Sequence, residues 1–368
     1  MSQPGDVSNE DLTVHLCGPE DREEQARLFN QVFKKTVNSR ALAWRYDENP
    51  HGSAISLLSR PPGGDGICGY ACSPRRFVPH GDEDFAALIG ETGDVMTHPE
   101  WRKRGIFSSL DAACMRETKE RGWPAVFGLP NRHSADIFLR IGWEQVGTIR
   151  HHSHLLRSDE HARAERFREG RVAALTVPWH ARKAQAARRR LEVGASGFVV
   201  RQLDAFPAAV EALSKAREGE FSIMVRRDAQ YLNWRFLESP SGLHRVLGVF
   251  DSADNLRGYS VVQLPRAGEY KGWLVDLLAF DAAAEDAALL AGLRLLEEAG
   301  TSVVQANAID DSYWARVLKR AGFVEPKPDN HLIVILFAND SKHPLVRAAH
   351  DASKWYLTDG DRDDETVG

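Results

Sequence analysis

The sequence predicts an α/β (α+β) protein built from two copies of one unit, each with a mixed central sheet flanked by helices. Three observations support this fold class. The chain has 368 residues, which suits two domains at roughly 100–200 residues each. Short apolar strands alternate with segments whose apolar residues recur at helical spacing. The segment LAWRYDENPHG at 42–52 recurs as LNWRFLESPSG at 232–242.

The repeat extends beyond this segment. GDVMTHP (93–99), ETKERGWPAVFG (117–128) and FLRIGW (138–143) correspond in order to WLVDLLAFD (273–281), LLEEAGTSVVQA (295–306) and LKRAGF (318–323). The spacing between matched segments shrinks along the chain, so the second copy has lost residues in its middle. Two copies of about 140 residues each explain the length of the chain.

Composition narrows the class of protein. The hydrophobic fraction of 43% supports sizeable cores and excludes global disorder. The net charge of −5, from 47 basic and 52 acidic residues, argues against a nucleic-acid partner. The polar N-terminus lacks the features of a signal peptide, and the longest apolar run (332–338) is far too short for a membrane span. With four cysteines and no zinc spacing, we expect reduced thiols, no metal and a cytoplasmic location.

The first copy shows its elements in order. The pattern predicts a helix over 20–35, strands near 54–60, 67–74 and 91–97, and a helix after position 105. A strand over 125–129, a short helix over 134–141 and a strand over 144–155 complete the unit. The expected division is an N-terminal domain (1–157), a charged helical linker (158–195), a C-terminal domain (196–340), and a terminal helix with an acidic tail (341–368). We expect the acidic end to be mobile.

The segment DVMTHPEWRKRGIFSSL (94–110) carries the chemistry. A strand leads into a turn that contains Arg102, Lys103, Arg104 and Gly105 and opens directly into a helix. A helix N-terminus presents unpaired N–H groups and partial positive charge, and Gly105 allows close approach of a ligand. The segment therefore predicts a pyrophosphate site. Neither GxxxxGK[ST] nor GxGxxG occurs, which excludes the usual nucleotide-hydrolysing and dinucleotide-binding motifs.

This segment resembles the acyl-CoA motif of the GNAT N-acetyltransferase superfamily, Arg/Gln-x-x-Gly-x-Gly/Ala. Arg102 and Gly105 match the motif, whereas Phe107 stands where Gly or Ala is usual. PNRHSADIFLRIGW (130–143) is similar to a second block of the family, with Asn131 and Ser134 in place and Phe138 where many members carry Tyr. The combination with WRY-x-x-NP also resembles tandem-domain members among bacterial polysaccharide and amino-sugar enzymes.

The resemblance implies two tandem GNAT-like domains and acetyl-CoA, or another acyl-CoA, as co-substrate. The implied CoA-binding residues are Val95, Met96, Thr97, Arg102, Lys103, Arg104, Gly105, Ile106, Phe107, Asn131, Ser134 and Phe138. The main chain of 95–97 would hold pantetheine and donate to the oxyanion.

Two carboxylates on the same strand are candidate general bases. Glu91 lies eleven residues before Arg102, where histone-type members of the superfamily carry their base, and Asp94 is the alternative. In a regular strand the two side chains would point to opposite faces. Phe138 would leave the family's usual thiolate acid missing, which costs little because thiols titrate near pH 8.5.

The second copy lacks the basic, glycine-containing turn, since Ala-Ala-Ala-Glu-Asp follows Asp281. We expect this degenerate copy not to bind CoA. Trp44 and Arg45 have counterparts there, which favours a packing role; acceptor binding, with Arg45 pairing to a phosphate or carboxylate, is the alternative.

The resulting hypothesis is an acyl-CoA-dependent N-acyltransferase. It would act by direct attack of a primary amine, most simply on an amino sugar or sugar nucleotide, in a ternary complex. Two alternatives stay open. One is a Fem-type peptidyl transferase that uses aminoacyl-tRNA, supported by the basic segment 180–190; the other is a non-catalytic acyl-CoA sensor.

Overall fold

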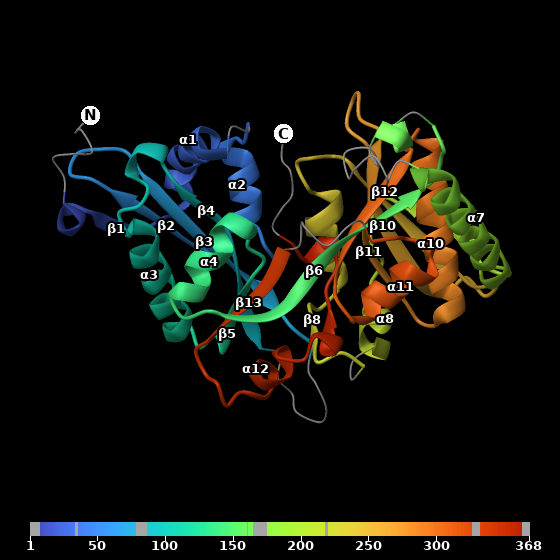
Figure 1. Cartoon of the computed structure of the whole chain (residues 1–368). Coiled ribbons are helices and arrows are strands. Elements are labelled where there is room, and N and C mark those ends of the chain that lie inside the picture. The colour runs from blue at the N-terminus through green and yellow to red at the C-terminus, as the bar shows by residue number, and fades with distance from the viewer. Residues whose placement is uncertain are drawn as a thin grey trace.

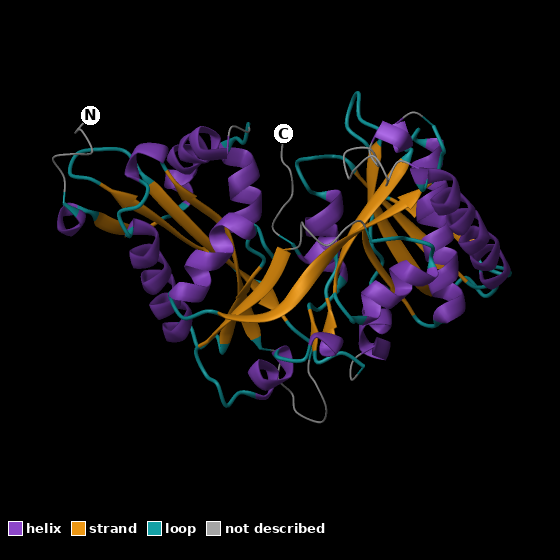
Figure 2. Ribbon diagram, in the orientation of Figure 1, coloured by secondary structure: helices purple, strands orange, loops and turns teal. Residues whose placement is uncertain are grey.

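The computed structural model describes residues 8–33, 36–78, 87–159, 161–164, 175–217, 220–325 and 332–362. One twelve-stranded sheet runs through the molecule and is flanked by helices on both faces (Figures 1 and 2). The expected α/β class with mixed sheets is therefore confirmed. No helix in this described part of the chain combines the length and the apolar character needed to cross a membrane.

The N-terminal half contains the predicted elements in order and, in addition, β1 and α2, which were not predicted. Its strands and helices are β1 (Thr13–Leu16), α1 (Arg22–Phe33), α2 (Ser39–Tyr46), β2 (Ile55–Arg60), β3 (Cys68–Arg76), β4 (Leu88–Thr97), α3 (Ile106–Glu120), β5 (Ala125–Gly128), α4 (Arg132–Arg140) and β6 (Glu144–Leu155). Short 3-10 turns lie at η1 (Asn9–Asp11), η2 (Pro19–Asp21) and η3 (Pro99–Trp101). Leu58, Ala71 and Met96 pack against α1 and α2, whereas Ile55, Leu57 and Val126 pack against α3 on the other face.

The C-terminal half repeats this order with additions. It comprises α7 (Val177–Gly194), β7 (Val199–Leu203), α8 (Val210–Arg217), β8 (Ile223–Met224), α9 (Ala229–Leu232), η4 (Asn233–Leu237), β9 (His244–Phe250), β10 (Leu256–Gln263), β11 (Lys271–Ala279), α10 (Ala282–Glu298), β12 (Val303–Ile309), α11 (Tyr313–Arg320), β13 (Leu332–Ala338), α12 (Pro344–Ala349), η5 (Ala352–Lys354), β14 (Trp355–Tyr356) and η6 (Asp359–Asp361). The helix expected over 341–354 is shorter, because it starts at Pro344 and gives way to the turn η5.

The strand order shows how the two copies join. It reads β1-β2-β3-β4-β5-β13-β6-β12-β11-β10-β9-β7, and among these described strands the only parallel pairs are β4–β5 and β11–β12. The last strand of each copy has crossed to the other: β13 pairs with β5, and β6 pairs with β12. Figure 1 shows this exchange, with β13 in the half that contains α3 and β6 running toward α7. Each half therefore needs a strand from the other to complete its sheet.

The repeated Trp-Arg-aromatic element lies at the junction of the copies. Trp44 and Trp234 stack with ring centroids 5.0 Å apart, and each indole N–H donates to the other's backbone carbonyl at 3.0 Å. His51 stacks on Tyr231 beside them, at 4.3 Å. The largest core cluster among the described residues contains both tryptophans and side chains from both halves of the sheet. The offset of 190 residues seen in the sequence thus corresponds to a pseudo-twofold contact.

The end of the chain is packed into the fold as far as Arg362, including the first acidic residues of the end that we expected to be mobile. Residues 355–362, here called the C-terminal strap, are mostly buried between the halves. Trp355 and Tyr356 form β14 against β8, and the buried Arg227 pairs with Asp276 and with Asp361 of the strap at 3.1 and 2.8 Å. The tail beyond Arg362 lies outside the described residues. The four cysteines are buried and form no disulfide.

Candidate active site

The turn between β4 and α3 has the backbone that an anion site needs. Gly105 precedes the first residue of α3 and has φ 77°, a left-handed conformation that glycine adopts without strain. Since glycine has no side chain, it cannot cap the helix, and the first N–H groups of α3 remain available to a ligand. A Cβ built on Gly105 would meet no other atom within 4 Å, so the space in front of the helix is open.

Basic side chains surround this turn. Arg102 and Lys103 are exposed and Arg104 is half-buried. Arg102 Nε donates to the carbonyl of Thr97 at 3.2 Å, and the Arg104 guanidinium lies 5.0 Å from the centre of the Trp101 ring. These contacts hold the turn against the end of β4. The arrangement places positive charge around the open N-terminus of α3.

The strand that leads into this turn separates from its neighbour. β4 pairs with β5 only over 90–92, opposite 126–128. The register between β3 and β4 shifts beside Asp94, whose φ is 45°. The strand is therefore not regular, and Glu91 and Asp94 line the same pocket instead of pointing to opposite faces. The bulge thus brings both candidate bases to one site.

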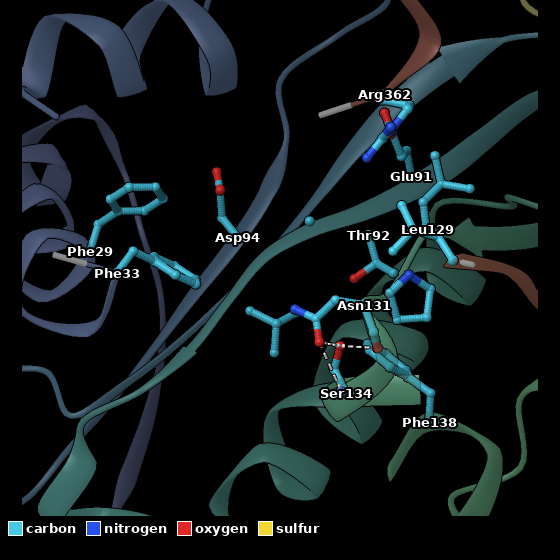
Figure 3. A pocket seen from close by; sticks show the side chains of 14 residues that line it. Phe29, Phe33, Glu91, Thr92, Asp94, Leu129, Asn131, Ser134, Phe138 and Arg362 are labelled. Atoms are coloured by element: carbon cyan, nitrogen blue, oxygen red, sulfur yellow. Dashed lines mark hydrogen bonds between the residues drawn. The ribbon is translucent and has the colours of Figure 1, made fainter. Parts of the chain in front are cut away.

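The pocket where the strands separate, here called the acyl pocket, has a volume of about 250 Å³ (Figure 3). It is lined by Phe29, Phe33, Glu91, Thr92, Gly93, Asp94, Val95, Leu129, Pro130, Asn131, Ser134, Phe138, Leu332 and Arg362. Figure 3 shows Asp94 facing the α1 phenylalanines, with Glu91 near Arg362. The pocket thus combines an aromatic wall with carboxylates on the strand.

The two carboxylates have different partners. Glu91 is buried and forms an ion pair with the equally buried Arg75 at 2.5 Å. The carboxylate of Asp94 pairs with Arg45 at 2.5 Å and accepts from the Tyr46 hydroxyl at 2.6 Å. Arg45 therefore contacts the site through Asp94. Trp44 does not line the acyl pocket and packs on Trp234 instead.

An aromatic cluster lies behind the pocket. Phe138 lines the pocket and meets Phe107 and Trp143 edge to face, each at 5.1 Å, and Phe107 also stacks on Tyr70 at 6.0 Å. The Tyr70 hydroxyl and the Trp143 indole both donate to Asp111, whose pKa is raised by burial. The two departures from the family motif, at 107 and 138, thus pack against each other.

The remaining predicted residues lie along the same path. Val95 and Thr97 are half-buried on β4, whereas the side chains of Met96 and Ile106 point into the cores on either side of the sheet. Asn131 and Ser134 meet at the start of α4, where the Asn131 side-chain oxygen accepts from the Ser134 backbone N–H at 3.2 Å.

Sequence reasoning missed the pocket residues on other elements. Phe29 and Phe33 belong to a predicted helix, but no local signal shows which surface that helix covers. Arg362 comes from the strap, far along the chain, and Leu332 begins the exchanged strand β13. Such residues are identified only once the topology is known.

The N-terminal half is similar to a known family over most of its length. Residues 13–146, which contain the turn, the separated strands and both carboxylates, match the family model of the acetyltransferase (GNAT) domain. Residues 13–146 form a GNAT acetyltransferase domain. The expected GNAT resemblance is thereby confirmed for this domain. No protein of curated function is similar enough in sequence to count as a match.

Solved structures share the architecture at low sequence identity. A GCN5-related N-acetyltransferase from Anabaena variabilis superposes with a TM-score of 0.61 at 12% identity, over 89% of this chain and 73% of its own. A probable N-acyltransferase from Enterococcus faecalis gives 0.59 at 11%, over 89% and 73%. A tandem GNAT protein from the clavulanic acid biosynthesis pathway gives 0.55 at 14%, over 89% and 98%. At these identities the likeness establishes the fold, which is that of two GNAT-like domains in tandem.

Proposed function

We propose that the chain transfers an acyl group, in the simplest case acetyl, from acyl-CoA to the primary amine of a small acceptor such as an amino sugar or sugar nucleotide. One observation carries the proposal. The open, basic N-terminus of α3 directly follows strand β4, and a pocket with two carboxylates lies along the same strand. The first feature suits a pyrophosphate, and the second suits an amine that must lose a proton.

The residues proposed to bind CoA fall into three groups, which would contact different parts of the ligand. Arg102, Lys103, Arg104 and Gly105, with the N–H groups of Ile106 and Phe107, would hold the pyrophosphate. The main chain of 95–97 would hold pantetheine, because β4 has left β5 there and its backbone groups are available on that side. Asn131, Ser134 and Phe138 line the far side of the same pocket. The site would thus hold the thioester between β4 and α4.

The chemistry needs few groups from the protein. The amine nitrogen forms a bond to the thioester carbon, the carbon–sulfur bond breaks, and the thiolate leaves. The amine's proton passes to Glu91 or Asp94, directly or through water. Glu91 is our first choice, by its place relative to Arg102; Asp94, which Arg45 and Tyr46 hold in place, is the second. Phe138 has no proton to give, so the thiolate would be protonated by water.

The test is a titration with acetyl-CoA by calorimetry, followed by thiol release with a panel of amines. We expect Glu91→Gln and Asp94→Asn to bind acetyl-CoA like the parent chain, and the variant that lacks the base to lose turnover by about 100-fold or more. Asp310→Asn is the matched control, because Asp310 pairs with Arg150 at 2.8 Å and does not line the acyl pocket.

Other outcomes would point elsewhere. A chain that does not bind acetyl-CoA would overturn the proposal. Binding without turnover on any amine would favour the sensor, and transfer from aminoacyl-tRNA would favour the peptidyl transferase.

We also propose the sequence-based division for the function: an acyl-CoA-binding region at 1–157, a linker at 158–195, a degenerate copy at 196–340 and a terminal region at 341–368. The exchange of β6 and β13 adds a condition, because residues 1–157 alone would leave the edge of β5 unpaired. The full chain is therefore the unit for these experiments.

A further inference from the structure

The C-terminal half has a second pocket, which lies at the start of β11. β11 and β12 pair in parallel only over 271–273, opposite 303–305, as β4 and β5 do in the first half. A pocket of about 280 Å³ is lined by residues of this paired stretch and by the loop that precedes β11. We call it the anion pocket and define it by the lining residues Arg235, Arg266, Lys271, Trp273, Gln305 and Arg362.

The charge of this pocket is positive. Two of its lining side chains are acidic, Glu269 and Asp359, and four are cationic, namely Arg235, Arg266, Lys271 and Arg362. With His244 taken as neutral, the lining has a formal charge of +2. Asp359 is already engaged, since its carboxylate accepts from the Asn307 backbone at 2.7 Å and pairs with Arg362 at 3.0 Å. A concave site with this balance favours an oxyanion.

The N-terminus of α10, which follows β11, is not open to a pyrophosphate as the N-terminus of α3 is. The Asp281 side chain accepts from the backbone N–H groups of Ala283 and Ala284, at 3.1 and 2.9 Å, at the start of α10. These are the groups that a pyrophosphate would need. The anion pocket therefore suits a smaller anion than CoA.

The strap connects the two pockets. Arg362 lines both the acyl pocket and the anion pocket. The buried guanidinium of Arg235 fixes this end of the strap, because it donates to the carbonyls of Gly360, at 2.8 Å, and Arg362. A molecule held in the anion pocket would thus lie next to the amine side of the acyl pocket.

We propose that the anion pocket binds the phosphate or carboxylate end of the acceptor while its amine enters the acyl pocket. Lys271 and Arg266 would pair with the oxyanion. The Trp273 face and the Gln305 amide would contact an adjoining sugar ring and its hydroxyls. This inference rests on the proposed function and narrows its substrate to anionic amines, such as amino-sugar phosphates.

The first test is direct binding to the full chain with coenzyme A at saturation, so that the α3 turn is filled. Inorganic phosphate and glucosamine 6-phosphate are titrated and followed by phosphorus NMR. We expect both to bind, and Lys271→Met and Arg266→Gln each to weaken binding by about tenfold or more. Lys215→Met is the matched control, because Lys215 is exposed on α8 and does not line the pocket.

The second test is competition in the thiol-release assay. Phosphate should compete with the acceptor amine and not with acetyl-CoA, and glucosamine 6-phosphate should be preferred to glucosamine by about tenfold in kcat/KM. Absence of phosphate binding, equal binding by all variants, or inhibition that is not competitive with the amine would overturn the inference. Each of these would leave both acetyl-CoA binding and acetyl transfer to an amine intact, whereas failure of the proposed function would abolish at least one of the two.

Discussion

The two halves of the molecule share a fold but differ at one helix end. In the first half, α3 begins after Gly105, which has no capping side chain and follows three basic residues. In the second half, α10 begins after Asp281, whose carboxylate binds the first N–H groups of the helix. The same helix terminus thus suits an anionic ligand when it is left open and is neutralised when a carboxylate caps it. This difference is consistent with the proposed CoA site in the first half and with its expected absence from the second half.

The halves also share a contact that neither could make alone, and its removal should have the largest effect. We expect Trp44→Ala and Trp234→Ala each to lower the free energy of unfolding by about 3–5 kcal/mol, because both indoles are buried against each other. The double variant should lose less than the sum, since one contact is counted twice. Urea unfolding measures both quantities.

Trp179→Ala is the control for this experiment, because Trp179 is 59% exposed on α7. The milder Trp44→Phe should leave the KM for the amine unchanged. A raised KM with normal stability would show that Trp44 contacts the acceptor. Packing on Trp234 would then not be its only role.

The second prediction concerns a variant in which the N-terminus of α3 carries a carboxylate, as the N-terminus of α10 does. Gly105→Asp places a carboxylate at the N-terminus of α3, where it would repel the pyrophosphate and compete for its N–H groups. We expect acetyl-CoA binding to weaken by about 100-fold or more, which is about 3 kcal/mol. Calorimetry measures the affinity.

Gly122→Asp controls for strain in this experiment. Gly122 has φ 73°, lies just beyond the other end of α3 and, like Gly105, has no atom within 4 Å of a built Cβ. If both variants weaken acetyl-CoA binding equally, the effect comes from backbone strain and not from the charge placed at the N-terminus of α3.

The local parts of this comparison follow from the sequence, and the non-local parts do not. The basic turn is a short continuous segment, and so is the acidic segment at the equivalent place in the second copy. The residues around Gly105 and Asp281 therefore distinguish the two copies by sequence alone. The bulge at Asp94 cannot be predicted in this way, because a left-handed aspartate within a strand leaves no periodic signal. The Asp94–Arg45 pair spans 49 residues, and the exchanged strand β13 pairs with β5 through residues as far apart in the chain as Ile335 and Gly128. Contacts at such separations depend on topology, which hydrophobic periodicity does not encode.

The third prediction tests the junction between the halves by acid. Burial, with Arg75, Arg76 and Arg226 nearby, lowers the pKa of His51 to about 3 from the ordinary value of 6.5. Between these values the unfolded chain binds a proton that the folded chain does not, so stability is full above pH 6.5 and falls as the pH drops. His51 alone should cost about 2 kcal/mol between about pH 7 and pH 5.

The measurement is urea unfolding as a function of pH, with His51→Gln as the variant. Its curve should be flatter by that amount, even if the variant is less stable at neutral pH through loss of the stack on Tyr231. An unchanged slope would mean that His51 is not kept neutral at the junction, and that buried groups such as His154, with a pKa lowered to about 4 by burial, account for the acid sensitivity.

The smallest expected effect comes from removing the N-terminal cap of α10. Asp281→Ala removes the cap of α10 and its ion pair with Arg257 at 2.8 Å, and we expect a loss of about 1 kcal/mol in the free energy of unfolding. Asp281→Asn, which keeps a capping oxygen, should lose only a fraction of that. Neither variant should gain a second acetyl-CoA site, since no basic turn precedes α10. If calorimetry showed a second site in Asp281→Ala, the cap alone would separate the two halves, and the arginines and lysine at 102–104 would matter less than the open N–H groups of α3.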